Sequence, residues 1–537
     1  MDKAFRKTFR SLTEISAHFD RNSTEQSFRL LKELSSKKLP DGKYLNEYMN
    51  LLQFMLAYPA NGKVERLVKS EVSRIASHLK KRPEKKKEIY RNSGLPFTAG
   101  NSRFSHDCLR WLMEHPDVTV EMDDFNDAVF DLNDVLKLTL PSVERSETTA
   151  GLENNDLLTA LKVNDRHKLQ FLVEQISTMD SLPFIKDQLF DNLGLYVKLK
   201  PRNRNYSLAY NKLDWSPVFY HEELLKKFDA SALLNKEIPQ PMKLSPAQHK
   251  LALKVIRNAM TLTDRETDPT TYTDENSLRI YQLERGIAIA LFGITSDRQL
   301  PLENYVGLTL FKNGMPAAYG GCWVFGQRAN FGINVFEPYR GGESGFIICQ
   351  LLRLYRQVFS IDHFEVEPYQ FGLDNPDGIK SGAFWFYHRF GFRPVDKELF
   401  RLSEMEHKKI QADKNYRSSE KTLIRFTESN VALRISDVKH RSVPEFCSAI
   451  TTMIARKYKG NRQKAVTHSI SNFLKHSGLS MPTGKAELQV LEDVALWAAS
   501  TKVMSANRYQ KMAELISAKP TDMYLYQEKL LELFRMD

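Results

Sequence analysis

A glycine-rich segment, RGGESG at residues 340–345, lies between a strand-like run and an amphipathic helical run. A tight turn that joins a strand to a helix gathers backbone N–H groups at the positive end of the helix dipole. These groups bind an anion without help from side chains. The segment therefore predicts an anion-binding site. The alternative interpretation is that Gly341 and Gly342 serve only the tight turn.

One carboxylate, Glu343, stands inside this turn. A carboxylate in the first turn of a helix is itself a good partner for the dipole, and it would repel a phosphate bound there. Two like charges 4 Å apart repel by about 4 kcal/mol at an effective dielectric constant of about 20. We therefore expect an anion here only if the Glu343 side chain points away from the amides of residues 341–345.

The periodicity around the turn predicts the elements that hold it. Asn313-Gly314 is the preferred two-residue hairpin turn, and a second turn at residues 326–328 leads into a third strand. The three strands are expected to be antiparallel, with Pro316 at an edge position. A helix with a continuous apolar face follows the glycine turn; its apolar residues are Ile348, Leu351, Leu352, Tyr355, Val358 and Phe359.

The flanking segments are expected to complete the unit. A helix begins near Ser245, and a second helix is expected from about Leu278 to Phe292. After the long helix, HFEVEPYQF at residues 363–371 predicts a strand, residues 383–389 a short helix, and residues 392–395 a final strand.

Two local motifs make residues 245–402 resemble the GCN5-related N-acyltransferase superfamily, most closely over 335–395. The pyrophosphate loop of that family reads Q/R-x-x-G-x-G/A; Arg340 and Gly345 match it, and Glu343 replaces its inner glycine. The Asn often found three residues before the second motif is Lys380 here. That second motif, A-x-x-[LF]-Y-x-x-x-G-F, is matched at every spacing by Ala383, Phe386, Tyr387, Gly391 and Phe392.

The resemblance implies an α+β fold with a mixed, mainly antiparallel sheet, and acetyl-CoA or another acyl-CoA as co-substrate. Strands that splay apart in this family expose backbone groups with which the pantetheine arm pairs like an added strand. The donor-binding residues implied here are Val335, Phe336, Arg340, Gly341, Gly342, Ser344 and Gly345.

The resemblance also implies an acid and a base for acyl transfer. Tyr387 would protonate the departing thiolate, and a carboxylate would take the amine proton. Glu337, Glu365 and Glu367 are the candidates for the base, and Glu367 ranks first because it nears a strand end. The alternatives are a core aromatic for Tyr387 and the solvated face of a strand for the glutamates.

Three functions remain open at this point. The first is an acyl-CoA-dependent N-acyltransferase, acetyltransferase-like, whose amine acceptor lies on a small molecule or a protein. The second is a transferase of the same fold that uses aminoacyl-tRNA or acyl carrier protein as donor. The third is a non-catalytic binding or scaffold protein, because fold does not imply function.

Charge and composition limit the partners. The formal net charge is +11 and the pI about 9.1, which favours anionic partners and leaves RNA contact open through basic segments such as residues 80–87 and 201–206. The four cysteines form no CxxC pair and the 13 histidines no HExxH, so no metal site is expected. GxSxG, GxxxxGK[ST] and GxGxxG are also missing, which argues against α/β-hydrolases, P-loop NTPases and simple Rossmann enzymes.

The 537 residues are expected to form several domains. We predict a helical N-terminal region over 1–240 with a break near 141–156, an acyltransferase-like domain over 245–402, and a helical C-terminal region over 403–537. No run approaches the ~18 apolar residues of a membrane span, and the N-terminus lacks an apolar signal segment. A cytoplasmic protein is therefore expected.

Overall fold

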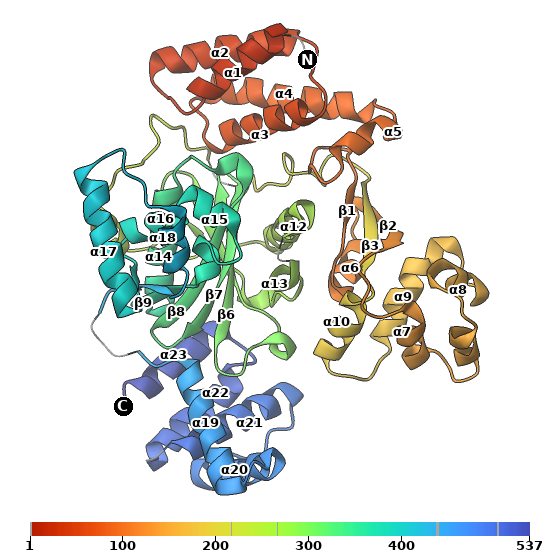
Figure 1. Ribbon diagram of the computed structural model, residues 1–537, viewed down its shortest axis with the longest axis vertical. Coiled ribbons are helices and arrows are strands. Elements are labelled where there is room, and N and C mark those ends of the chain that lie inside the picture. The colour runs from red at the N-terminus through yellow and green to blue at the C-terminus, as the bar shows by residue number, and fades with distance from the viewer. Residues whose placement is uncertain (1–2, 216, 266, 437–439, 502–503, 537) are drawn as a thin grey trace.

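The computed structural model describes residues 3–215, 217–265, 267–436, 440–501 and 504–536. At its centre lies an eight-stranded sheet in the order β10-β11-β9-β8-β7-β6-β5-β4 (Figure 1). The strands are β4 (Arg279–Gln282), β5 (Ile287–Phe292), β6 (Asn304–Lys312), β7 (Met315–Phe325), β8 (Arg328–Val335), β9 (His363–Val366), β10 (Arg393–Pro394) and β11 (Val431–Arg434).

Neighbouring strands of this sheet are antiparallel except β8 and β9, which are parallel. The predicted β6–β7 hairpin is confirmed: Asn313 and Gly314 both have positive φ, 46° and 80°, as the preferred two-residue turn requires. The predicted β7–β8 turn is confirmed as well, since Phe325 pairs with Arg328.

Alternation along the strands gives the sheet two apolar faces. In β5, Ile289 and Leu291 face one core, and Ala290 and Phe292 face the other. Helix α14 (Ser344–Phe359) packs on the first face; α12 (Pro246–Thr263), capped by Ser245, packs on the second. Helices α15 (Pro376–Ser381) and α16 (Ala383–Arg389) lie on the α14 side, and α13 (Thr267–Thr271) on the α12 side (Figure 1).

Two sequence predictions for this sheet are wrong. The helix expected over 278–292 is the β4–β5 hairpin, because Arg285 and Gly286 both have positive φ and turn the chain inside the apolar run. Pro316 does not lie on an edge strand, since β7 pairs with both β6 and β8. It lies at a β-bulge, before the pairing with β8 begins at Ala318, so no ladder hydrogen bond is lost.

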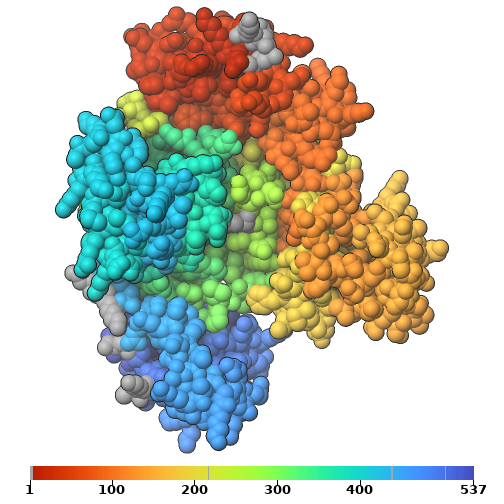
Figure 2. Space-filling model, in the orientation of Figure 1, coloured from red at the N-terminus to blue at the C-terminus, as the bar shows by residue number. Residues whose placement is uncertain are grey.

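The N-terminal layer covers one end of the sheet, drawn in red in Figures 1 and 2. Asp20 and Asn61 cap α2 and α4 by accepting hydrogen bonds from backbone N–H groups. The layer shares its apolar core with the sheet. Its elements are α1 (Lys3–Ile15), α2 (Arg21–Ser36), α3 (Lys43–Ala57), α4 (Gly62–Lys80), α5 (Glu84–Lys87) and η1 (Glu88–Tyr90).

A second part, orange to yellow in Figure 2, has a core of its own. The all-helical prediction fails here, because β1 (Gly100–Ser102), β3 (Leu195–Pro201) and β2 (Val118–Phe125) form a three-stranded sheet. Its pairings join segments far apart in the chain, which local periodicity does not reveal. Its helices are α6 (His106–Met113), α7 (Leu132–Thr139), η2 (Glu144–Thr149), α8 (Asn154–Ala160), η3 (Asp165–His167), α9 (Lys168–Ser177) and α10 (Pro183–Asp191).

The C-terminal region is helical apart from β11, which pairs with β9 and β10 and so extends the central sheet past residue 402. The last five helices form a bundle below the sheet in Figure 1. These helices and the two that precede them are α17 (Lys397–Ala412), α18 (Glu420–Phe426), α19 (Val443–Tyr458), α20 (Arg462–Ser477), α21 (Lys485–Ser500), α22 (Ala506–Ala518) and α23 (Met523–Phe534). Within the described residues, no helix has the length and apolarity that crossing a membrane requires.

Candidate active site

Strands β8 and β9 separate in the middle of the sheet. Their parallel pairing is confined to Arg328–His363, Ala329–Phe364 and Asn330–Glu365. Beyond Asn330, β8 continues to Val335 paired with β7 alone, while β9 ends at Val366 and is followed by η7 (Pro368–Phe371). Among the described strands, none pairs with the β9-facing edge of residues 331–334, which could accept an extended ligand, whereas the Val335 carbonyl already accepts a hydrogen bond from Arg340 Nε.

The glycine turn follows directly after β8. The chain passes through η6 (Glu337–Tyr339), reaches Gly341 with φ +83°, and enters α14 at Ser344. A Cβ on Gly342 would lie 2.5 Å from the Tyr58 hydroxyl oxygen, and one on Gly345 would lie 2.9 Å from Phe390 Cζ. These two glycines are required by close packing, whereas Gly341 is required by its backbone conformation.

The Glu343 carboxylate points away from the turn. It lies 2.6 Å from Lys312 Nζ and 2.8 Å from Arg285 Nε, and it accepts a hydrogen bond of 2.8 Å from the Leu225 N–H. Burial alone would raise the Glu343 pKa, but Lys312 and Arg285 outweigh it and lower the pKa. Burial in turn lowers the pKa of Lys312 to about 8. The Glu343 side chain thus points away from the amides of residues 341–345, as we expected would be necessary for an anion to bind at this turn.

The first backbone amides of α14 remain available. The Gly342 N–H donates to the Tyr339 carbonyl at 3.3 Å, and the Glu343 N–H points to the Tyr58 hydroxyl at 3.4 Å. In the described part of the chain, the N–H groups of Ser344, Gly345 and Phe346 donate no hydrogen bond. Ser344 and Gly345 are partly exposed. Three consecutive amides at a helix N-terminus thus form a cradle for an anion.

The other expected donor-binding residues differ in their availability. Arg340 is exposed, and its Nε donates to the Val335 carbonyl at 3.1 Å. The Phe336 N–H donates to the Ala317 carbonyl at 3.0 Å, so this N–H is not available to a ligand. Val335 pairs with Ala318 on the β7 side.

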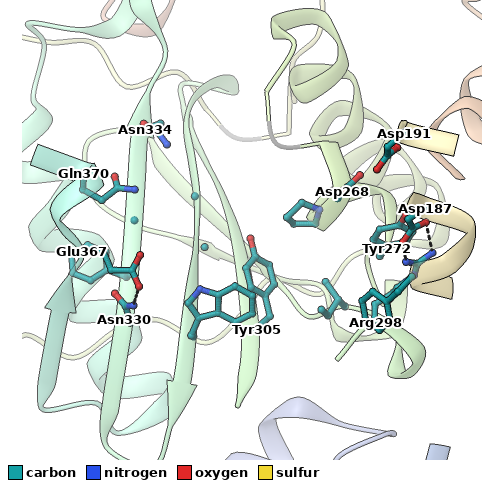
Figure 3. Close-up of a pocket in the computed structure, with 18 of the residues that line it drawn as sticks. Asp187, Asp191, Asp268, Tyr272, Arg298, Tyr305, Asn330, Asn334, Glu367 and Gln370 are labelled. Carbon is teal, nitrogen blue, oxygen red and sulfur yellow. Dashed lines mark hydrogen bonds and ion pairs between the residues drawn. The ribbon is translucent and has the colours of Figure 1, made fainter. Parts of the chain in front are cut away.

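A cavity of about 530 Å³ opens on the α12 face of the sheet, beside the separating strands (Figure 3). Its floor is formed by Gly320, Gly321 and Gly332, where a Cβ would come within 2.7 Å of neighbouring atoms or closer. The sheet side also carries polar and aromatic side chains: Tyr305, Trp323, Asn330, Asn334, Glu367 and Gln370. The opposite side comes from α10, α13 and the segment after β5, and contains Asp187, Asp191, Asp268, Tyr272 and Arg298.

Among the three candidate bases, Glu367 alone lines this cavity. Glu367 is exposed and accepts a hydrogen bond of 2.5 Å from Asn330 Nδ2. Glu365 is buried between Arg328 and His363. Hydrogen bonds from these two outweigh the burial that would raise its pKa and bring it to about 2. Glu337 is exposed in η6 and does not line the cavity.

Tyr387 lies behind the separating strands, not on the cavity wall. Its ring packs against Phe371, Phe386 and Phe392, and 4% of the residue is exposed. Burial raises the Tyr387 pKa. Within the described residues, its hydroxyl makes no hydrogen bond, which is uncommon for a buried tyrosine. The packing explains the ring, and it leaves the hydroxyl without a hydrogen-bond partner among the described residues.

Sequence reasoning missed the wall that faces the sheet. Asp191 ends a helix of the second part, and Asp268 lies in a segment that the sequence marks only as a polar loop. Neither residue belongs to a motif, so no local signal could have placed them opposite Glu367. In the described ranges, no group of three or more His, Cys, Asp or Glu is placed to hold a metal ion.

No family model, no curated protein and no solved structure was found to match this chain.

Proposed function

We propose that this chain is an acyl-CoA-dependent N-acyltransferase of the GCN5-related type, which moves an acyl group such as acetyl to an amine. One observation carries the proposal: β8 and β9 separate at the point where α14 presents three free amides, with the Glu343 carboxylate turned toward Lys312 and Arg285. An anion cradle beside an open strand edge suits a donor that has a pyrophosphate at one end and an amide-containing arm at the other.

The donor would lie across the gap between the strands. Its pyrophosphate would accept hydrogen bonds from the Ser344, Gly345 and Phe346 amides, with Arg340 near by. The protonated Lys312 and Arg285 together outweigh the single charge of Glu343, so this cluster adds positive potential behind the helix N-terminus. The pantetheine arm would follow the edge of residues 331–334 toward the cavity.

The chemistry assigned to this site is aminolysis of a thioester. The amine nitrogen bonds to the acyl carbon while the C–S bond breaks, and the amine gives one proton to Glu367, directly or through a water. The thiolate takes its proton from the Tyr387 hydroxyl. Glu367 is assigned as base because it is the candidate carboxylate on the cavity wall, and Tyr387 as acid because its hydroxyl has no partner in the described structure.

Isothermal titration of the full chain with acetyl-CoA and longer acyl-CoAs tests the donor assignment. We expect saturable binding that weakens by about tenfold or more in Arg340→Glu, which places a carboxylate beside the cradle. Arg462→Glu is the matched control, because Arg462 is also exposed at the start of a helix and donates to a backbone carbonyl at 2.9 Å. No binding by the wild-type chain, or equal effects of the two variants, would contradict the assignment.

Further measurements distinguish the proposed function from its two rivals. Three observations motivate the hypothesis of an aminoacyl-tRNA or acyl carrier protein donor: the positive net charge, the large helical additions and Glu343. The Glu343 side-chain geometry removes the third, because the carboxylate points away from the turn. The net charge and the helical additions remain. RNA that copurifies and is stripped by salt would favour this rival. Absence of activity across a broad screen of donors and amines would favour a non-catalytic protein.

A further inference from the structure

The cavity wall opposite the sheet carries carboxylates that lack a cation. Arg298 pairs with Asp187 and, at 3.0 Å, with Asp107, and it lies 3.9 Å above the Tyr272 ring. Its charge is therefore already engaged. Asp191 and Asp268 are exposed to the cavity, and within the described residues the Asp191 carboxylate makes no hydrogen bond or ion pair. We name Asp191 and Asp268 the acidic wall (Figure 3).

The position of Asp191 is unfavourable for a carboxylate in the free protein. It is the last residue of α10, where the negative end of the helix dipole repels an anion. Partial loss of solvent inside the cavity, followed by the charges of Asp268 and Asp187, raises the Asp191 pKa to about 6, although Arg103 and Arg298 oppose the shift. Partial loss of solvent raises the Asp268 pKa as well. A cation bound between these two side chains would relieve this repulsion.

The rest of the cavity also suits a cation. The Tyr305 and Trp323 rings meet edge to face, 4.8 Å apart, and both line the cavity, where an aromatic face attracts an ammonium group. Glu367 supplies another negative charge on the sheet side. This pocket is acidic in a chain whose net charge is +11, so its local charge does not follow the charge of the whole molecule. A volume of about 530 Å³ falls in the range of small-molecule sites.

We infer that the acceptor is a small amine with two or more ammonium groups, one of which is held by the acidic wall while a second amine beside Glu367 reaches the acyl carbon. The inference rests on the proposed N-acyltransferase function. The amine at the wall keeps its proton and acts as an anchor. The second ammonium group first releases one proton to solvent. Its neutral nitrogen then forms the C–N bond as the thioester C–S bond breaks, the next proton passes to Glu367, and the thiolate takes its proton from Tyr387. Asp191 and Asp268 are specificity-determining residues in this account.

Titration with 1,5-diaminopentane in the absence of any acyl donor tests the inference independently of donor binding. The matched ligand is 5-amino-1-pentanol, which has the same chain length and one ammonium group. We expect the diamine to bind at least about tenfold more tightly than the amino alcohol, with an affinity that falls as salt is added. Equal affinities, or no binding of the diamine, would overturn the inference, whatever acyl-CoA does.

Single substitutions test whether the acidic wall holds an ammonium group of the ligand. Asp191→Asn and Asp268→Asn should each weaken diamine binding by about tenfold or more, and they should weaken the amino alcohol as well, because its single ammonium group also binds at the acidic wall. Asp156→Asn, an exposed carboxylate of α8 outside the cavity, is the control and should change neither ligand. Circular dichroism verifies that each variant is folded. Folded acidic-wall variants that bind the diamine as tightly as the wild-type chain would refute the assignment. Loss of acyl-CoA binding with the diamine preference intact would instead count against the donor site alone.

Discussion

The Glu343 carboxylate lies 2.6 Å from Lys312 Nζ, and both side chains are fully buried. Glu343 immediately precedes α14, and Lys312 is the last residue of β6. The Leu225 N–H, from the N-terminal region, donates a further hydrogen bond to the Glu343 carboxylate. The Glu343 carboxylate therefore holds three parts of the chain together. It leaves the amides of Ser344–Phe346 uncovered.

Replacing Glu343 by glycine should destabilise the protein without improving donor binding. Glu343→Gly leaves Lys312 buried without its anion, and breaking a buried pair costs about 3–5 kcal/mol. Acyl-CoA affinity should not rise, because the carboxylate is not in the cradle. Urea unfolding and calorimetry measure the two effects. Glu337→Gln, an exposed carboxylate near the same turn, should stay within about 0.5 kcal/mol of wild type. Tighter acyl-CoA binding by Glu343→Gly would show that the carboxylate obstructs the site.

Glu367→Gln should lower kcat by about 10²–10⁴-fold and leave the fold intact, because the amide keeps the shape but cannot accept the amine proton. Steady-state acyl transfer to a diamine measures this effect, with Glu337→Gln as control. A rate within a few-fold of wild type would remove Glu367 from the base role.

Tyr387→Phe should lower the rate of acyl transfer and leave the free energy of unfolding nearly unchanged. The hydroxyl makes no hydrogen bond within the described residues, so its loss should change the free energy of unfolding by less than about 0.5 kcal/mol. The rate should fall by about a hundredfold if the phenol protonates the thiolate. Tyr355→Phe, in the buried face of α14, is the control for a tyrosine far from the reacting atoms. An unchanged rate in Tyr387→Phe would show that Tyr387 packs in the core and does not act as the acid.

Asp191→Asn should stabilise the free protein at neutral pH. A carboxyl whose pKa is raised in the folded state contributes stability at low pH that is lost as pH rises through its folded pKa of about 6. The variant removes that loss, so its Tm should exceed that of wild type by about 1–3 °C at pH 7.5 and match it near pH 4. Asp187→Asn should do the opposite, because Asp187 pairs with Arg298. A lower Tm for Asp191→Asn at pH 7.5 would mean that its carboxylate is a structural partner.

The parts of the fold that the sequence predicts correctly have local signals. The β6–β7 turn has Asn313-Gly314, and α14 has a continuous apolar face after the glycine turn. The β4–β5 hairpin was missed because its short strands lie in one apolar run, and Arg285 is an unusual residue for a turn with positive φ. Glu367, ranked first among the candidate bases from its place near a strand end, lines the cavity, and its role as base stays a prediction.

The direction of Glu343 and the acidic wall could not be predicted from the sequence. The partners of Glu343 come from a strand end, a hairpin turn and the N-terminal region, none of them near it in the chain. Asp191 faces the sheet because the second part packs beside α13, and that contact depends on tertiary structure alone. Long-range packing decides which charges meet.

Binding of the donor at the α14 amides can be observed on Gly345 itself. Labelling serine with ¹³C at the carbonyl and glycine with ¹⁵N selects the Ser–Gly steps, which place signals on Gly94, Gly345, Gly382 and Gly478. The account predicts that acetyl-CoA shifts the Gly345 amide resonance to saturation, while Gly94 and Gly478 stay in place. A Gly345 resonance that does not move at saturating acetyl-CoA would contradict it.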